Sequence, residues 1–399
     1  MTRTRSRIAG FIFDNSLLLL AGTAAAVIWA NVDVQSYDAV AHPLYFWVND
    51  VGMVFFFALA AKEVFEATLP GGPLASARRA ASPLAAAVGG MVAPALIYVT
   101  LASTRGPGEL VRGWAIPCAT DIAFSAMVAR LIFPAAHPAI PFLLLLAIAD
   151  DALGLLVLAA FYPSGPLSPW ALAGLMTAAV LAALWLRRRG TRSFWPYVLA
   201  PGAISWAALY LGGFHPALAL VPIVPFMPHT AADLGLFDPG EEYRHDTLNR
   251  FEHWWATPVH CVLLLFGFAN AGVPFEQIGP GTYYVLAGLL FGKPLGILLF
   301  SGMARLAGAQ LPPGLRVGEL LVVGVVAAIG FTVSLFFSTA AFHDGPALAE
   351  TKMGALLSLV AAPIAIVIAR VVRSRAAWQP QSAELSTATS RKPLDARHE

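Results

Sequence analysis

Long apolar runs separated by short polar connections dominate the chain. Most runs are roughly 20 residues long, which is the length that crosses a bilayer as a helix. Twelve runs can be marked: 12–31, 48–68, 82–102, 113–134, 139–162, 169–186, 194–212, 214–228, 254–271, 283–304, 317–342 and 353–373. The pattern predicts an all-α membrane protein with twelve transmembrane helices. Residues 1–373 are expected to form a single polytopic domain whose first run is an uncleaved span.

Composition supports a membrane protein. Hydrophobic residues make up 58% of the chain and charged residues 12%, whereas soluble domains are about 25% charged. The net charge of +2 gives no reason to expect nucleic acid as a partner. Cys118 and Cys261 both lie in apolar runs, which favours small buried side chains over a disulfide. The polar tail, 374–399, is predicted to be disordered.

Lysine and arginine concentrate in alternate connections between the runs. One set contains Arg3, Arg5, Arg7, Arg78, Arg79, Arg130, Arg187, Arg188, Arg189, Arg192, Arg244, Arg250, Arg305, Arg316, Arg370, Arg373 and Arg375. The opposite set contains only Arg105, Arg112 and Lys352. Because basic residues accumulate on the cytoplasmic side, we expect both termini to face the cytoplasm.

Two runs contain helix breakers at a similar depth. Pro117 interrupts the fourth run and Gly330 the eleventh, and proline disfavours helix around it. Each run is the middle member of a three-helix group, 82–162 or 283–373. Interrupted helices in matching places indicate inverted-topology repeats with a binding site between them. The alternative is ordinary variation, since glycine and proline are common in membrane helices.

Ionisable residues are scarce inside the runs. They are Asp121, Asp150, Asp151 and Lys293, with Lys62 and Glu63 near the end of the second run. A carboxylate at the bilayer centre costs about 2.5–3.5 kcal/mol on insertion scales. Two adjacent carboxylates in one span therefore point to function rather than to structure alone.

The aspartate pair suits exchange of a cation for a proton. Neighbours on a helix point about 100° apart, so one can face a cavity while the other faces a protein partner. Carboxylate oxygens suit a hard cation such as Na⁺, and buried, adjacent carboxylates also hold protons more readily. A site that binds either Na⁺ or H⁺, but not both at once, is the minimum requirement for exchange of the two ions. A helix cap or a buried hydrogen-bonded acid is the structural alternative.

Lys293 admits two roles, which are compatible. With Asp121 it would neutralise the partial charges of helix ends where two broken helices cross. In the second role, Lys293 would pair with Asp150 and be released when a cation binds the site. Thr120 would either place a hydroxyl near the site or only stabilise the break.

Six short motifs, in this order, resemble the NhaA-type sodium/proton antiporters. They are Trp47–Asp50, Gly113–Phe124, Asp150–Asp151, Phe268–Val273, Phe291–Gly296 and Ile329–Ser334. The resemblance extends over nearly all of residues 1–373. It implies exchange of cytoplasmic Na⁺ or Li⁺ for external protons, electrogenic and driven by the proton gradient across a bacterial inner membrane.

The resemblance also implies roles for individual residues. Asp151 would be the main cation ligand, and Asp150 its essential neighbour in contact with Lys293. Asp121 and Lys293 would balance the helix ends, with Thr120 beside them. The expected partners are Na⁺, H⁺ and the lipid bilayer, with no cofactor and no enzymatic activity. A homodimer through the connection 32–46 is the family-level expectation.

Regulation by cytoplasmic pH is a further implication. The matching candidate sensors are Glu63, Glu252, His253 and His215. Phe65 and Glu66 stand where relatives carry basic residues, and Thr257 stands where a second histidine often falls. These departures leave the pH profile open.

Two other functions have to be weighed. A sodium-coupled symporter on a similar fold would need a larger polar pocket for an organic substrate. An intramembrane aspartyl enzyme would pair Asp121 with Asp150 or Asp151, but it has no use for adjacent aspartates or for Lys293.

Overall fold

The computed structural model describes residues 17–229 and 246–375, with the side chains of 77–79 and 374–375 left out. Residues 374–375 of the predicted tail still belong to helix α17 (Ala361–Arg375). Its remaining residues, 376–399, and the basic residues Arg3, Arg5, Arg7 and Arg244 fall outside the described part. The described residues contain helices and no strand. This confirms the predicted all-α class.

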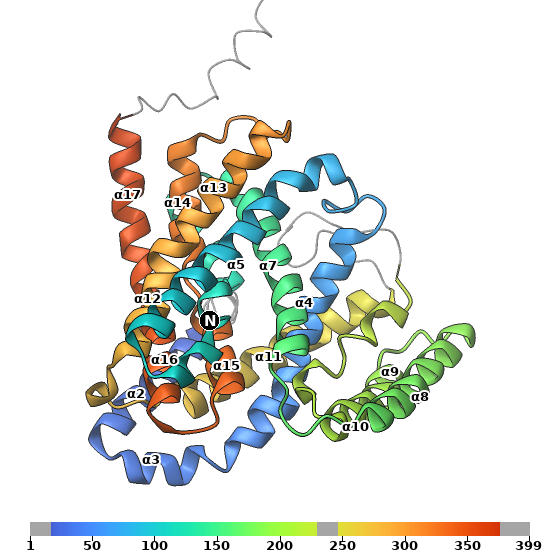
Figure 1. The fold of residues 1–399 in the computed structure, drawn as a ribbon. Helices are drawn as coiled ribbons and strands as arrows, with labels where there is room; N and C mark the ends of the chain where they lie inside the picture. Colours follow the sequence, from blue (N-terminus) through green and yellow to red (C-terminus); the bar gives the residue numbers. More distant parts are fainter. Residues whose placement is uncertain (1–16, 230–245, 376–399) are drawn as a thin grey trace, which may run out of the picture.

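The helices coincide with most of the apolar runs, and Figure 1 shows how they are arranged in space. In the first half they are α2 (Leu17–Val32), α3 (Val34–Ala41), η1 (Phe46–Gly52), α4 (Met53–Thr68), α5 (Ala77–Arg105), η2 (Gly108–Gly113), η3 (Ile116–Cys118), α6 (Ile122–Ile132), α7 (Ala139–Phe161) and α8 (Pro169–Arg188). In the second half they are α9 (Trp195–Tyr197), η4 (Val198–Gly202), α10 (Ala203–Gly212), η5 (Pro216–Leu218), η6 (Val224–Phe226), α11 (Thr247–Asn270), η8 (Phe275–Gln277), α12 (Pro280–Ala287), η9 (Gly288–Gly292), α13 (Lys293–Leu306), α14 (Val317–Ala327), α15 (Phe331–Ala341), α16 (Gly345–Leu357), η10 (Ser358–Val360) and α17 (Ala361–Arg375).

Several of these helices can cross a membrane. Five described helices are long and apolar enough, and eight spans result if three bent helix pairs are each counted once. The multi-pass architecture is therefore confirmed, whereas the count of twelve stays a prediction. The expected helix at 214–228 is wrong, because only the short 3-10 turns η5 and η6 form there. Pro216, Pro222 and Pro225 remove the backbone donors that an α-helix would need.

Both predicted helix breaks are present. The η2–η3 segment and α6 meet at a bend of 51°, and α14 and α15 meet at a bend of 49°. The two breaks touch, because the Asp121 amide donates to the Ile329 carbonyl over 2.7 Å. The crossing of the two broken helices is thus confirmed. The inverted-repeat relation between the three-helix groups remains a prediction.

Close packing of α5 on α13 positions the lysine of the site. A Cβ placed at Gly89 or at Gly296 would overlap the backbone carbonyl oxygen of the other residue. Only glycine permits this approach of two helix backbones. Lys293 stands one turn before Gly296, so the crossing holds its side chain inside the helix bundle, where it is completely buried.

Candidate functional site

Asp150 forms a buried ion pair with Lys293. The Lys293 Nζ lies 2.9 Å from Asp150 Oδ2, and both side chains are fully buried. The Thr120 hydroxyl donates to the same carboxylate oxygen over 2.7 Å. Among the described residues, Asp150 Oδ1 has no hydrogen-bond partner. The carboxylate therefore keeps one oxygen for a further ligand or a proton.

Lys293 also reaches the end of a helical segment. Its ammonium donates to the carbonyl of Cys118, the last residue of η3. A cation is favourable there because helix C-termini carry partial negative charge. The geometry thus contains both contacts considered for Lys293, the carboxylate and the helix end.

Asp121 serves the opposite kind of helix end. It is the N-cap of α6, and its Oδ1 accepts from the Phe124 amide over 3.2 Å. Its Oδ2 accepts from the Thr332 amide over 3.1 Å and from the Thr332 hydroxyl. One carboxylate therefore caps the first turns of α6 and α15 together, which stabilises both.

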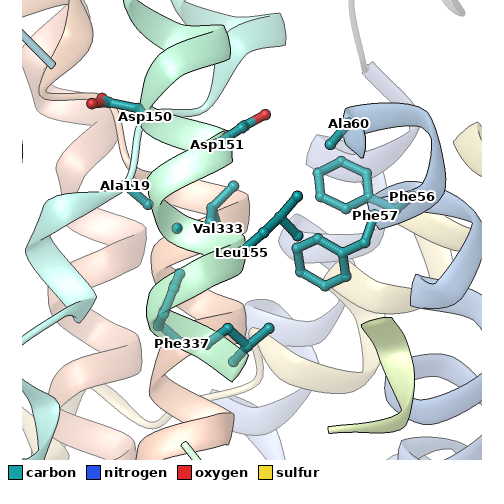
Figure 2. A pocket seen from close by; sticks show the side chains of 11 residues that line it. Phe56, Phe57, Ala60, Ala119, Asp150, Asp151, Leu155, Val333 and Phe337 are labelled. Carbon is teal, nitrogen blue, oxygen red and sulfur yellow. The ribbon is translucent and has the colours of Figure 1, made fainter. Parts of the chain in front are cut away.

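Asp151 faces a different environment from its neighbour. Figure 2 shows the two carboxylates pointing away from each other, with Asp151 directed toward α4. Asp151 is half-buried, whereas Asp150 is 1% exposed. Asp151 lines a cavity of about 10 Å³ with Phe57 and Ala60 of α4 and Phe337 of α15. That is about the space of one water molecule, so the cavity suits a small ion or a proton carrier.

A second buried charge cluster lies farther along α4. The Lys62 Nζ stands 2.5 Å from Glu66 Oε2 and 2.5 Å from Glu252 Oε2. The ammonium is completely buried, and the cluster ties α4 to α11. Glu252 is one of the predicted pH sensors, whereas its partners Lys62 and Glu66 were not predicted; the i,i+4 spacing of Lys62 and Glu66 is the available signal. His253 is exposed and Glu63 is half-buried.

His215 lies apart from the other three candidate sensors. Its Nδ1 is 3.9 Å from Asp50 Oδ1, and it caps η5 by accepting from the Ala217 amide over 3.4 Å. Asp50 precedes Lys62 by three helical turns, which is about 18 Å along the helix. The structure therefore brings Glu252 and Lys62 together but leaves His215 at the far end of α4.

A protein-family model described as Na⁺/H⁺ antiporter 1 matches residues 12–369. The chain belongs to this family. Members named Na⁺/H⁺ antiporter NhaA are similar over most of their length. The protein of Desulfitobacterium hafniense is 46% identical over 380 residues, covering 92% of this chain and 97% of that protein. That of Geobacter metallireducens is 45% identical over 374 residues, covering 90% and 96%.

One solved structure has a similar overall fold. The sodium proton antiporter MjNhaP1 from Methanocaldococcus jannaschii matches with a TM-score of 0.52, covering 89% of this chain and 91% of that chain. Sequence identity is 16%, so this likeness concerns the fold alone. It agrees with the helical arrangement described above.

Proposed function

We propose that this chain is a sodium/proton antiporter. It expels cytoplasmic Na⁺ or Li⁺ in exchange for external H⁺ by alternating access, and it is a transporter rather than an enzyme. The observation that carries the proposal is the buried Asp150–Lys293 pair beside Asp151, in a cavity with space for one small ion. The names of the relatives, at 45–46% identity over most of the chain, support it.

Charge balance explains why such a site couples two ions. With Asp150 and Asp151 ionised and Lys293 protonated, the empty site carries one net negative charge. A bound Na⁺ or a proton on Asp151 neutralises it. Moving the uncompensated charge through the low-dielectric interior is costly, so the loaded forms cross and the empty form does not. This is the exchange rule that an antiporter needs.

Electrogenic exchange requires more protons than Na⁺ ions per cycle. One proton on Asp151 against one Na⁺ would move no net charge. The Asp150–Lys293 pair would supply the second proton: if bound Na⁺ displaces the ammonium from Asp150, Lys293 releases its proton. The Na⁺-loaded site then keeps one negative charge, the doubly protonated site is neutral, and the empty site, with two negative charges, is still the most costly form to move. Asp121 and Thr120 then hold the crossing in place and do not exchange ions.

The two other functions fit the geometry less well. A cavity of about 10 Å³ around Asp151 has no space for an organic substrate, which disfavours a symporter. Both Asp121 oxygens are occupied by the helix starts of α6 and α15, which disfavours an aspartyl dyad.

The membrane location and the orientation of the chain are part of the same proposal. We infer a multi-pass protein of a bacterial inner membrane, with both termini cytoplasmic and the Lys62 end of α4 toward the cytoplasm. Glu63, Glu252 and His253 lie in that half of the proposed arrangement and are proposed to contribute to pH regulation. His215 would act from the opposite end. A homodimer would use the connection 32–46, most of which forms α3.

The decisive experiment measures collapse of a preformed pH gradient in everted vesicles on addition of Na⁺, Li⁺ or K⁺. We expect Na⁺ or Li⁺ to collapse it and Asp151→Asn to abolish the response. Asp344→Asn is the matched control, because it removes a carboxylate from an exposed position and should leave exchange intact. A fully active Asp151→Asn protein would refute the assignment.

A further inference from the structure

The connection between α6 and α7 brings a histidine to the start of the helix that carries the two aspartates. The Ala139 amide, the first of α7, donates to His137 Nδ1 over 3.2 Å. The Ile140 amide donates to the His137 carbonyl over 3.1 Å, and Pro141 has no amide hydrogen. His137 therefore accepts from the first two amides of α7, which have no partner within the helix.

The hydrogen bond from Ala139 determines where the imidazole carries its proton. A ring nitrogen that accepts from an amide has no proton of its own, so the neutral ring is protonated on Nε2. Nε2 lies 3.6 Å from Glu319 Oε1, and each side chain is 12% exposed. A charge-assisted hydrogen bond is shorter than this. The structure therefore contains the neutral histidine, engaged with α7, and the contact with Glu319 has room to shorten.

Glu319 has the matching place on α14. Its Oε2 accepts from the Arg316 amide over 2.9 Å at the start of that helix, and its Oε1 faces the imidazole. Two helix starts are thus capped by side chains that face each other. Asp150 and Asp151 lie on α7, and α14 runs to the break at the helix crossing. A change in this contact would reach both parts of the ion site.

Two helices bring charged groups to the imidazole. Glu319 of α14 attracts a proton to His137, and Arg373 of α17 repels it. Burial is the largest effect and, together with Arg373, lowers the pKa of His137. The ring of Phe133, directly after α6, stacks on the imidazole with the centroids 4.9 Å apart. The other charged residues at these helix ends are Arg130 on α6, Arg316 before α14 and Arg370 on α17. His137 is therefore neutral at pH 7 and takes up a proton only under acidic conditions.

Protonation would reverse the two contacts of the ring. The added proton sits on Nδ1, where it faces the Ala139 N–H, and two donors cannot form a hydrogen bond. A positive charge is also unfavourable at the N-terminus of α7. The imidazolium is attracted to Glu319 instead, at a distance that can shorten to that of a charge-assisted hydrogen bond.

We propose that His137 is a proton-dependent positioning residue, which caps α7 when neutral and turns to Glu319 of α14 when protonated. It is a site of pH response separate from the candidates on α4 and α11. The consequence for transport, slower Na⁺ exchange when the cytoplasm is acidic, rests on the proposed antiport function. The switch itself concerns one helix start and can be observed without transport.

The first test measures backbone hydrogen exchange at the start of α7 in the purified full-length protein. Protection of the amides of residues 137–142 is compared at pH 7.5 and pH 5.5, after correction for intrinsic rates. We expect protection to fall about fivefold or more at the lower pH, because the cap is lost. In His137→Asn the fall should be absent, because the amide oxygen of asparagine accepts from the same N–H and does not titrate.

Two further variants make this test specific. Glu319→Gln removes the carboxylate that attracts the imidazolium, so the fall in protection should move to lower pH. His42→Asn is the matched control, because it removes an exposed histidine that lies on another part of the chain and should leave the fall unchanged.

The second test measures Na⁺ exchange in everted vesicles, whose cytoplasmic face is turned to the medium. We expect His137→Asn to extend exchange to lower pH by about half a unit or more, and Glu319→Gln to act in the same direction. His137→Lys carries a permanent charge and no acceptor, and should slow exchange throughout the active pH range.

The proposal is overturned if the parent shows no pH-dependent loss of protection at the start of α7, or if His137→Asn loses protection as the parent does. A pH profile of exchange that His137→Asn leaves unaltered would reject the regulatory role. If His137→Asn does not fold, Glu319→Gln decides, since an unshifted loss of protection would exclude the link to α14. A parent protein that shows the switch but exchanges no Na⁺ would instead count against the proposed function.

Discussion

Replacing Lys293 with alanine should expose the energetic role of the ion pair. The Asp150 carboxylate is 1% exposed, and without Lys293 its remaining described hydrogen-bond donor is the Thr120 hydroxyl. Removing one partner of a buried pair costs about 3–5 kcal/mol, because a buried charge is left without compensation. Asp150→Asn in the Lys293→Ala background removes that charge and should restore most of the loss.

The assay is thermal unfolding of the purified protein, combined with the everted-vesicle assay across pH. At roughly 2 °C per kcal/mol for a long chain, the single variant should unfold roughly 6–10 °C earlier than the parent. The pH profile of Na⁺ exchange should also shift, since a proton on Asp150 no longer competes with Lys293. Arg305→Ala, which removes an exposed cation from the same helix, is the control. Unchanged stability together with an unchanged pH profile in Lys293→Ala would refute the ion-pair reasoning.

Three further variants probe the helix ends and the connections. Asp121→Asn replaces an acceptor oxygen with a donor at one of two helix starts, so we expect a loss of about 1–3 kcal/mol, measurable as earlier thermal unfolding; unaltered stability would contradict the shared cap. Lys62→Met leaves Glu252 without its buried cation, so we expect about 3–5 kcal/mol of destabilisation together with a shifted pH profile of exchange. If neither effect is observed, the cluster has no role in stability or in the pH response. Burial, supported by repulsion from Arg373, holds the pKa of His137 below its usual 6.5 despite the attraction of Glu319. Because the unfolded chain then binds the proton more readily, stability falls as pH drops below about 6.5, and His137→Asn should flatten the dependence of unfolding temperature on pH.

The helix breaks and the aspartate pair could be predicted from the residues themselves. Pro117 and Gly330 are local conformational signals, and adjacent carboxylates in an apolar run are too costly to be incidental. The predicted helix at 214–228 is wrong because the hydropathy of this segment resembles that of a span while its prolines prevent an α-helix. Glu252 was identified by resemblance, but its partner Lys62 lies 190 residues earlier in the chain. No local pattern links positions so far apart.

The sequence by itself determined that this is an all-helical membrane protein with two broken helices and a costly pair of acids, because hydropathy, breakers and charge are properties of short stretches. Tertiary structure alone decided which charges meet. The close contact at Gly89 and Gly296 places Lys293 against Asp150, and the crossing lets one carboxylate, Asp121, cap two helices. It also decided that the cavity beside Asp151 has a volume of only about 10 Å³, since that void is bounded by side chains from α4, α7 and α15 together.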